Sequence, residues 1–396
     1  MQPVAGVALG SAAAGIKYKH RDDLTLIQLH EAAISAAVFT QNAFCAAPVV
    51  VARSHLGQSI PRYLLINAGN ANAGTGDQGV NDAIACCRAV SEQGGCEASQ
   101  VLPFSTGVIG ENLPLASITH ALPEAFNALS ESGWQTAAKS IMTTDTVPKG
   151  ITRQAEINGH TITMTGIAKG VGMICPNMAT LLSYVATDAG VSAPLLQECL
   201  EDLVSQSFNR ISVDGDTSTN DACVLVATGQ SPLTLIDNKH SQEYREFFAL
   251  ASDVFEFLAK ALVKDGEGAT KLVTVAVEQG ITEDECRKVA YTIAHSPLVK
   301  TALFASDPNW GRILAAVGRA GLQDLDVTQL NIFLDDVCIV LQGRRDGDYT
   351  EARGQQVMDR DEITITVQLG RGEAESRVWT CDFSYDYVKI NAEYRS

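Results

Sequence analysis

Residues 169–182 read KGVGMICPNMATLL, and this stretch decides how the chain is interpreted. Its two glycines and its proline predict a tight, irregular turn rather than a helix. Residues 161–165 before it alternate as a strand does, and residues 181–186 after it form a second strand-like run. The turn therefore joins two predicted strands, and it ends in the small residue Ala179 followed by the hydroxyl residue Thr180.

The chemistry available to Thr180 depends on whether the bond before it is cut. A threonine hydroxyl is a poor nucleophile unless a base takes its proton, and a free α-amine on the same residue can be that base. Cutting the Ala179–Thr180 bond would expose this amine, which ordinarily titrates near pH 8. The alternative is structural, because a β-branched residue is favoured at the start of a strand.

The rest of the chain alternates between strand-like and helical patterns. Ser192 can cap a helix that buries Leu195, Leu196, Cys199, Leu200, Leu203 and Val204. A longer helix is expected from Ser241 to Asp265-Gly266, burying Tyr244, Phe247, Phe248, Ala251, Phe255, Leu258 and Leu262. Strands are expected at residues 331–334, 337–341, 362–369 and 377–383. We expect a domain over residues 1–285 and a smaller α+β domain over 286–396.

Composition excludes several classes of protein. The 396 residues are 46% hydrophobic and 19% charged, which is enough to bury a large core, and the net charge of -17 disfavours nucleic acid and anionic membrane surfaces as partners. The ten cysteines are scattered, so buried thiols in a reducing compartment are expected, and no His/Cys spacing predicts a metal site. Without a signal-like or membrane-spanning run, the expected location is the cytoplasm.

Several motifs in this order resemble those of the ornithine acetyltransferase family, also called the glutamate N-acetyltransferases. Besides residues 169–182, the resemblance rests on the segments STGVIG (105–110), MTTDT (142–146), DGEGATK (265–271), SDPNWGR (306–312) and INAEY (390–394). It covers essentially the whole chain. It implies an α+β fold, namely an αββα sandwich of the DmpA/ornithine acetyltransferase type with a smaller C-terminal α+β domain. It also implies self-cleavage between Ala179 and Thr180 into chains 1–179 and 180–396, two copies of each forming the assembly.

The resemblance also implies an activity and a set of site residues. The expected enzyme moves acetyl from N2-acetylornithine to glutamate through acetyl-Thr180 in the arginine pathway, needs no cofactor, and in bifunctional members also takes acetyl from acetyl-CoA. Thr106 and Gly107 match the oxyanion hole. The matching substrate contacts are Thr143, Lys169, Thr180, Glu267, Asn391 and Ser396. Hydroxyl and amide groups suit a substrate carboxylate, whereas the Glu267 carboxylate suits an ammonium group. Lys169 could also lower the pKa of the Thr180 amine by like-charge repulsion.

Three other interpretations remain open from the residues. An aminopeptidase or amidase on the same scaffold would release the acyl group to water. A phosphotransferase centred on Asp214, which follows the strand-like residues 211–213, would need magnesium and would not need Thr180. An uncut binding protein would do no chemistry. The glycine-rich segment 70–79 has neither dinucleotide-binding nor P-loop spacing, so we expect a turn or a pocket-lining loop there.

Overall fold

The computed structural model describes residues 1–17, 19–175 and 181–393. The chain forms two compact units, one from residues 1–209 and 216–262 and the other from residues 210–215 and 263–396. We call them the first and the second unit. The predicted site residues Ala179, Thr180 and Ser396 lie outside the described residues.

The first unit contains two β-sheets. The four-stranded sheet has the order β1-β2-β4-β5, and the five-stranded sheet has the order β3-β10-β8-β7-β6. The strands of the first sheet are β1 (Val7–Ala12), β2 (Leu24–Leu29), β4 (Tyr63–Asn70) and β5 (Val101–Val108). Those of the second are β3 (Ile34–Phe39), β10 (Ala222–Ala227), β8 (Leu182–Thr187), β7 (His160–Lys169) and β6 (Lys149–Ile157).

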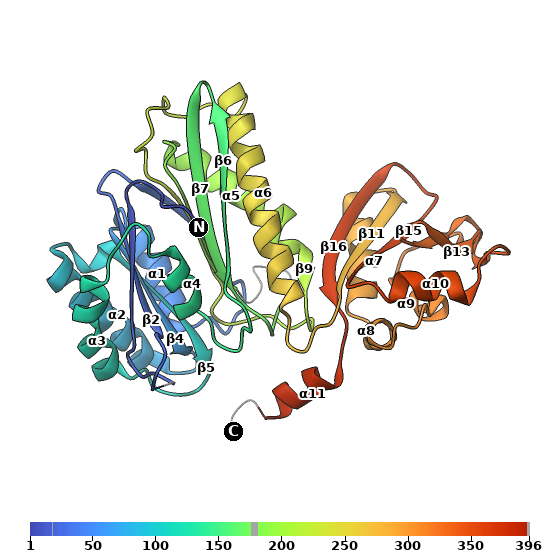
Figure 1. Ribbon diagram of the computed structural model, residues 1–396, viewed down its shortest axis with the longest axis horizontal. Helices are drawn as coiled ribbons and strands as arrows, with labels where there is room; N and C mark the ends of the chain where they lie inside the picture. The colour runs from blue at the N-terminus through green and yellow to red at the C-terminus, as the bar shows by residue number, and fades with distance from the viewer. Residues whose placement is uncertain (18, 176–180, 394–396) are drawn as a thin grey trace. The chain divides into compact units, whose positions relative to one another are not determined.

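Apolar side chains from both sheets meet in one core, among them Ile66 and Phe104 from the first sheet and Tyr184 and Val224 from the second. Helices cover the outer faces, giving the αββα order that Figure 1 shows for this unit, whereas the helices at Ala47–Leu56 and Trp134–Ser140 also contribute side chains to the core between the sheets, such as Val49 and Trp134. The helices are α1 (Ala47–Leu56), α2 (Gly76–Gly94), α3 (Leu115–Asn127), α4 (Trp134–Ser140), α5 (Ala193–Gln206) and α6 (Gln242–Lys264), whose last two residues count with the second unit. The predicted αββα sandwich is confirmed.

The second unit is built on one seven-stranded sheet of order β14-β13-β12-β15-β11-β16-β9. Its strands are β14 (Arg344–Arg345), β13 (Val337–Leu341), β12 (Asn331–Leu334), β15 (Glu362–Gln368), β11 (Leu272–Gly280), β16 (Ala374–Cys381) and β9 (Ile211–Ser212). Its helices are α7 (Glu283–Ala294), α8 (Pro297–Phe304), α9 (Trp310–Gly318), α10 (Glu351–Met358) and α11 (Tyr385–Ala392). Alternate residues of β11, Val273, Val275 and Val277, are fully buried against helix side chains such as Val289 of α7.

The division of the chain differs from the expected boundary near residue 285. Residues 263–285 belong to the second unit because β11 pairs with β15 on one side and with β16 on the other. Residues 210–215 join it from far away in the sequence, since Ile211 and Ser212 pair with Trp379 and Thr380. Such pairings between distant segments leave no local sign in the sequence.

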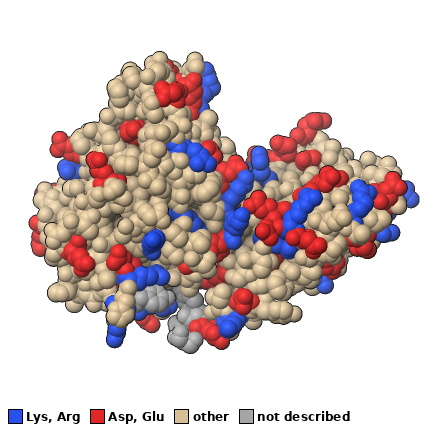
Figure 2. Space-filling view, viewed as in Figure 1, with Lys and Arg blue, Asp and Glu red and all other residues tan. Residues whose placement is uncertain are grey.

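The surface carries charges of both signs. On the face shown in Figure 2, Lys and Arg side chains of the second unit are interspersed with Asp and Glu. Such mixed charge lacks the clustered positive potential that binding to a phosphate backbone requires. Among the described residues, none of the helices has the length and apolar character needed to cross a membrane.

Candidate active site

Lys169 is the last residue of β7 and lies where the predicted site residues of the first unit converge. Its side chain is buried, with the residue 5% exposed. In the antiparallel pairing of β7 with β8, Lys169 lies directly opposite Leu182. Thr180, the predicted nucleophile, precedes Leu182 by two positions in the sequence and lies outside the described residues.

The Lys169 ammonium group joins two of the other predicted residues. Its Nζ donates hydrogen bonds to Thr106 Oγ1 at 3.0 Å and to Thr143 Oγ1 at 2.7 Å. Thr106 belongs to β5, and Thr143 follows helix α4. Three residues that the sequence analysis placed in separate motifs therefore form one cluster.

Gly107 follows Thr106 at an irregular point of the β4–β5 pairing. Gly69 pairs with Gly107, but Asn70 pairs with both Thr106 and Val108, so the register shifts there. The φ of Gly107 is +132°, and a Cβ at this position would lie 2.3 Å from the Gly69 carbonyl carbon. Only glycine fits this backbone conformation. The regular hydrogen-bond ladder between β4 and β5 is interrupted here.

Two buried asparagines, which the sequence analysis did not single out, hold the residue before Thr106. Asn67 donates through Nδ2 to Ser105 Oγ at 2.6 Å. Asn220 donates through Nδ2 to the Ser105 carbonyl at 2.9 Å and to the Ala71 carbonyl at 2.6 Å. The two asparagines thus hold Ser105 by its side chain and by its backbone carbonyl, directly before Thr106 and Gly107 in β5.

Asp221 was missed as well, and it binds the backbone directly before β8, the strand that pairs with β7. Its Oδ1 accepts a hydrogen bond from the Leu181 amide at 3.0 Å, and its own carbonyl accepts one from Thr40. Burial raises the pKa of Asp221 well above its usual range, although the Leu181 hydrogen bond and the Lys169 charge oppose this effect. The sequence signal that could have identified Asp221 is the pair Asn220-Asp221 just before an apolar strand. The same pattern also fits the start of a strand that has no functional role.

The remaining described site residues, Glu267 and Asn391, lie in the second unit. Asn391 Nδ2 donates to Glu267 Oε2 at 3.0 Å, so the structure brings this predicted pair together. Glu267 is 8% exposed, whereas Asn391 is exposed on α11. The amide therefore orients the Glu267 carboxylate.

Asp145 supplies the negative charge beside Lys169. Its carboxylate lies 2.7 Å from Lys149 Nζ and 4.0 Å from Lys169 Nζ, and all three side chains are almost completely buried. Burial alone would raise the pKa of Asp145, but the charges of Lys169 and Lys149 outweigh it and lower the pKa from 3.8 to about 2. The carboxylate therefore stays ionised at any physiological pH.

A pH dependence of stability follows from this lowered pKa. Because the folded-state pKa lies below the unfolded value, the stabilisation is complete above about pH 5 and is lost as the pH falls towards 2. A shift of this size corresponds to about 2 kcal/mol. Chemical unfolding of the parent and of Asp145→Asn should therefore show a stability difference that shrinks by about 2 kcal/mol between pH 5 and pH 2. A constant difference would contradict the ionic role of Asp145.

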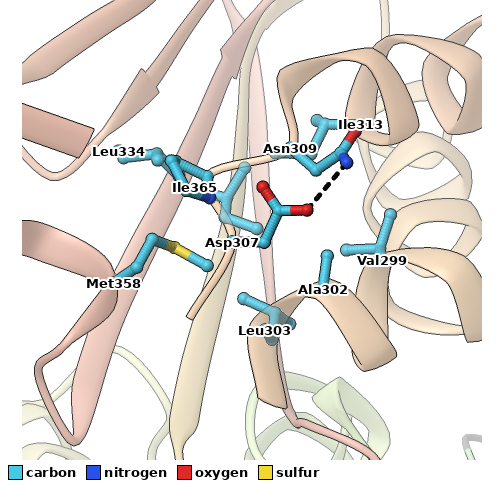
Figure 3. Close-up of a pocket in the computed structure, with 10 residues that line it drawn as sticks. Val299, Ala302, Leu303, Asp307, Asn309, Ile313, Leu334, Met358 and Ile365 are labelled. Atoms are coloured by element: carbon cyan, nitrogen blue, oxygen red, sulfur yellow. Dashed lines mark hydrogen bonds between the residues drawn. The ribbon is translucent and has the colours of Figure 1, made fainter. Parts of the chain in front are cut away.

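The motif at 306–312 serves the core of the second unit. Figure 3 shows the Asp307 carboxylate accepting a hydrogen bond from Asn309 Nδ2, at 2.9 Å, beside a cavity otherwise lined mainly by apolar side chains. Asn309 in turn caps α9 by accepting from the Arg312 amide. The cavity volume of about 10 Å³ has room for roughly one water molecule and none for an amino acid.

Two other features of the first unit also have an assigned place. Segment 70–79 runs from the last residue of β4 through a turn at residues 71–75 into α2, and Asn72 in this turn has a φ of +48° and donates through Nδ2 to the Gly79 carbonyl. A larger open hollow of about 560 Å³ is lined by residues of β3, α1 and α5, including Arg53 and Gln197. None of the predicted site residues that the structure describes lines it.

The first unit is thus an αββα sandwich with a buried polar cluster at its strand ends, an arrangement that suits an enzyme with an α+β fold. The chain belongs to the ArgJ family, whose model matches residues 8–396. It is 61% identical to the arginine biosynthesis bifunctional protein ArgJ of Methylococcus capsulatus, over 100% of this chain and 96% of that protein. It is 54% identical to the protein of the same name from Pseudomonas fluorescens, over 100% of this chain and 98% of that protein.

A solved structure agrees with this assignment. The crystal structure of the arginine biosynthesis bifunctional protein ArgJ from Bacillus halodurans is 37% identical, with a TM-score of 0.52. The match covers 54% of this chain and 99% of that chain.

Proposed function

We propose that this protein is a glutamate N-acetyltransferase that moves acetyl from N2-acetylornithine to glutamate through an acetyl-Thr180 intermediate. As a member of the ArgJ family, it is an acyltransferase of arginine biosynthesis. The observation that carries the finer proposal is the position of Lys169, which bonds Thr106 and Thr143 and lies opposite Leu182. This arrangement brings together a cation and two hydroxyls, with the irregular glycine backbone of Gly107 next to Thr106, which supports the proposal of an acyl-transfer site here.

Maturation would begin with attack by the Thr180 hydroxyl on the Ala179 carbonyl. The resulting N-to-O acyl shift and hydrolysis would leave chains 1–179 and 180–396, with the new α-amine of Thr180 as the base. The solved relative supports this step indirectly. Its chain matches little more than half of ours while being itself almost fully covered, as expected of a chain corresponding to residues 180–396.

In the transfer reaction, the Thr180 hydroxyl attacks the acetyl carbonyl of the donor, and the Thr180 amine takes the proton. The Thr106 and Gly107 region would stabilise the oxyanion, and collapse of the tetrahedral intermediate releases ornithine, whose leaving amine recovers the proton. Glutamate then enters, and its amine attacks the acetyl ester. The bond between the acetyl carbon and the Thr180 oxygen breaks, acetylglutamate is released, and the proton lost by the attacking amine passes through the Thr180 amine to the Thr180 oxygen. One amide exchange is thereby split into the formation and the breakdown of an ester, and each step has a lower barrier than the direct exchange.

The donor carries a carboxylate and a δ-ammonium group, and the two predicted sets of contacts match them in chemistry. Thr143 and Lys169, together with the Ser396 hydroxyl, suit the carboxylate, whereas Glu267, which accepts a hydrogen bond from Asn391, suits the ammonium group. Acetyl-CoA would serve as a second donor through the same acetyl-Thr180. We assign the enzyme to the cytoplasm as an assembly of two copies of each chain.

Donor and acceptor assays on the purified protein test this function. Acetylornithine with glutamate should give acetylglutamate and ornithine with parallel double-reciprocal plots, the pattern of a ping-pong cycle. A hydrolase would instead release acetate from acetylornithine. Added glutamate would then neither increase the rate nor convert the acetate product into acetylglutamate. Replacing acetylornithine by acetyl-CoA tests the second donor.

Glu267→Gln should impair the donor more than the acceptor. The substitution keeps an oxygen for Asn391 Nδ2 but removes the charge that would pair with the δ-ammonium group, which glutamate lacks. A hydrogen bond to a charged group contributes about 1.5 to 3 kcal/mol, so kcat/KM for acetylornithine should fall about tenfold or more. The value for glutamate should change little. Glu373→Gln, at an exposed position of the same unit, is the control, and equal losses for both substrates would refute the assignment.

A further inference from the structure

The Asp145 carboxylate contacts both segments that carry the Lys169–Thr143 pair. Its Oδ2 accepts a hydrogen bond from the Thr143 amide at 3.0 Å, and its Oδ1 accepts one from the Gly170 amide at 2.9 Å. The Asp145 side chain is 0% exposed. One carboxylate thus holds the backbone on either side of the contact between Lys169 Nζ and Thr143 Oγ1.

The same carboxylate lies between two buried cations. Lys149 and Lys169 are 3% and 5% exposed, and each needs a counter-charge because an isolated buried ammonium group is very costly. Asp145 is the acidic side chain that ion-pairs with both. With one negative and two positive charges, the three side chains keep a net positive charge at the place where a substrate carboxylate is expected.

An amide could not replace this carboxylate. Asparagine offers one acceptor oxygen, so it could not serve the Thr143 amide, the Gly170 amide and the Lys149 ammonium together. Its NH2 group would face one of these donors without an acceptor. The arrangement therefore requires an ionised carboxylate and not merely a polar residue of the same shape.

Resting on the proposed function, we propose that Asp145 is a positioning residue for the acyl transfer, holding the Lys169 ammonium charged and aimed at Thr106 and Thr143. It acts through Lys169 and the Thr143 backbone and does not touch the substrate. Its loss should weaken substrate binding and lower the pKa of Lys169. A residue that only held the fold together would change neither of these in a folded variant.

The test compares Lys149→Met with the double variant Asp145→Asn/Lys149→Met. The single variant removes one cation and keeps the carboxylate. The double variant removes one charge of each sign, so the net charge of the cluster equals that of the parent, and of the two lysines only Lys169 remains to lose the Asp145 charge. This charge balance protects folding, which thermal unfolding checks independently. Asp188→Asn is the matched control, since Asp188 Oδ1 also accepts a β7 amide, that of Thr163, at the other end of the strand.

The expected results separate positioning from stability. Relative to Lys149→Met, the double variant should lose about tenfold or more in kcat/KM, and the alkaline limb of its pH profile should move down by about one pH unit or more, since a unit charge 4 Å away has been removed. NMR titration of ¹³Cε-labelled lysine should show the same fall in the Lys169 pKa without substrate. Asp188→Asn should change the unfolding temperature and leave the pH profile in place.

The outcomes also keep this inference apart from the proposed function. If the parent transfers acetyl and the two variants share one kcat/KM and one Lys169 pKa, the role of Asp145 is refuted. If the parent transfers no acetyl, the proposed function fails. The lysine titration then still decides whether Asp145 controls the charge of Lys169.

Discussion

Thr180→Ala should leave the chain as one uncut polypeptide and abolish acetyl transfer. Alanine has neither the hydroxyl that would attack the Ala179 carbonyl nor the one that would carry acetyl. Removing the nucleophile of a covalent mechanism typically lowers the rate by about 10⁴-fold or more. Intact mass spectrometry measures the first effect, because the parent should give chains 1–179 and 180–396. Acetylglutamate formation measures the second.

Thr180→Ser is the matched control for this prediction. Serine keeps the hydroxyl and, after cleavage, the α-amine, so cleavage and transfer should both persist at a reduced rate. A cut Thr180→Ala protein would show that another group attacks the bond. An uncut Thr180→Ala protein that transfers acetyl at the parent rate would show that the acetyl-transfer site does not need Thr180.

Local patterns predicted many of the elements. The strands expected at 331–334 and 337–341 match β12 and β13 at both ends, because alternating apolar residues there face one core. The six residues expected on the inner face of α5 are all buried. The second strand of the opening motif begins one residue later than expected, at Leu182. Phe248 is a further correction, since it is half-buried near the start of α6.

The sequence could predict individual residues of the candidate site, each from its own motif, but not the contacts between them. Thr106, Thr143 and Lys169 could be named separately, and their hydrogen bonds now place them together. The sequence could not show that a single carboxylate, Asp145, serves both lysines, nor that Asn220 reaches the Ser105 carbonyl. These contacts depend on pairing between distant strands and loops, which no local pattern specifies.

The β4–β5 irregularity illustrates the same limit. The residues Ser-Thr-Gly predict an ordinary turn as readily as they predict a strained strand end. The distinction comes from Gly69, which is 38 positions away from Gly107 in the printed sequence and pairs with it in the sheet. A glycine whose absent side chain makes room for another backbone can be identified only when that backbone is in place.

Gly107→Ala should therefore disable the enzyme while most of the fold survives. The added Cβ would lie 2.3 Å from the Gly69 carbonyl carbon and 2.7 Å from the Asn70 nitrogen, so the backbone of β4 or β5 must move. Any such movement displaces the donor proposed to stabilise the oxyanion, and losing one such donor costs about 10²- to 10³-fold in kcat. Self-cleavage passes through a similar oxyanion, so it should slow as well. Steady-state kinetics and the time course of cleavage measure the two losses.

Gly110→Ala provides the matched control, because it separates backbone strain from the clash at the site. Gly110 lies in the same segment and also has a positive φ, +85°, but nothing lies within 4 Å of an added Cβ. Alanine there should cost about 1 kcal/mol in unfolding free energy and change kcat by less than about threefold. If Gly107→Ala folds and keeps the parent kcat, the backbone at Gly107 does not stabilise the transition state. If Gly110→Ala loses as much activity as Gly107→Ala, the effect belongs to the flexibility of the whole segment, because the close approach to Gly69 is absent at Gly110.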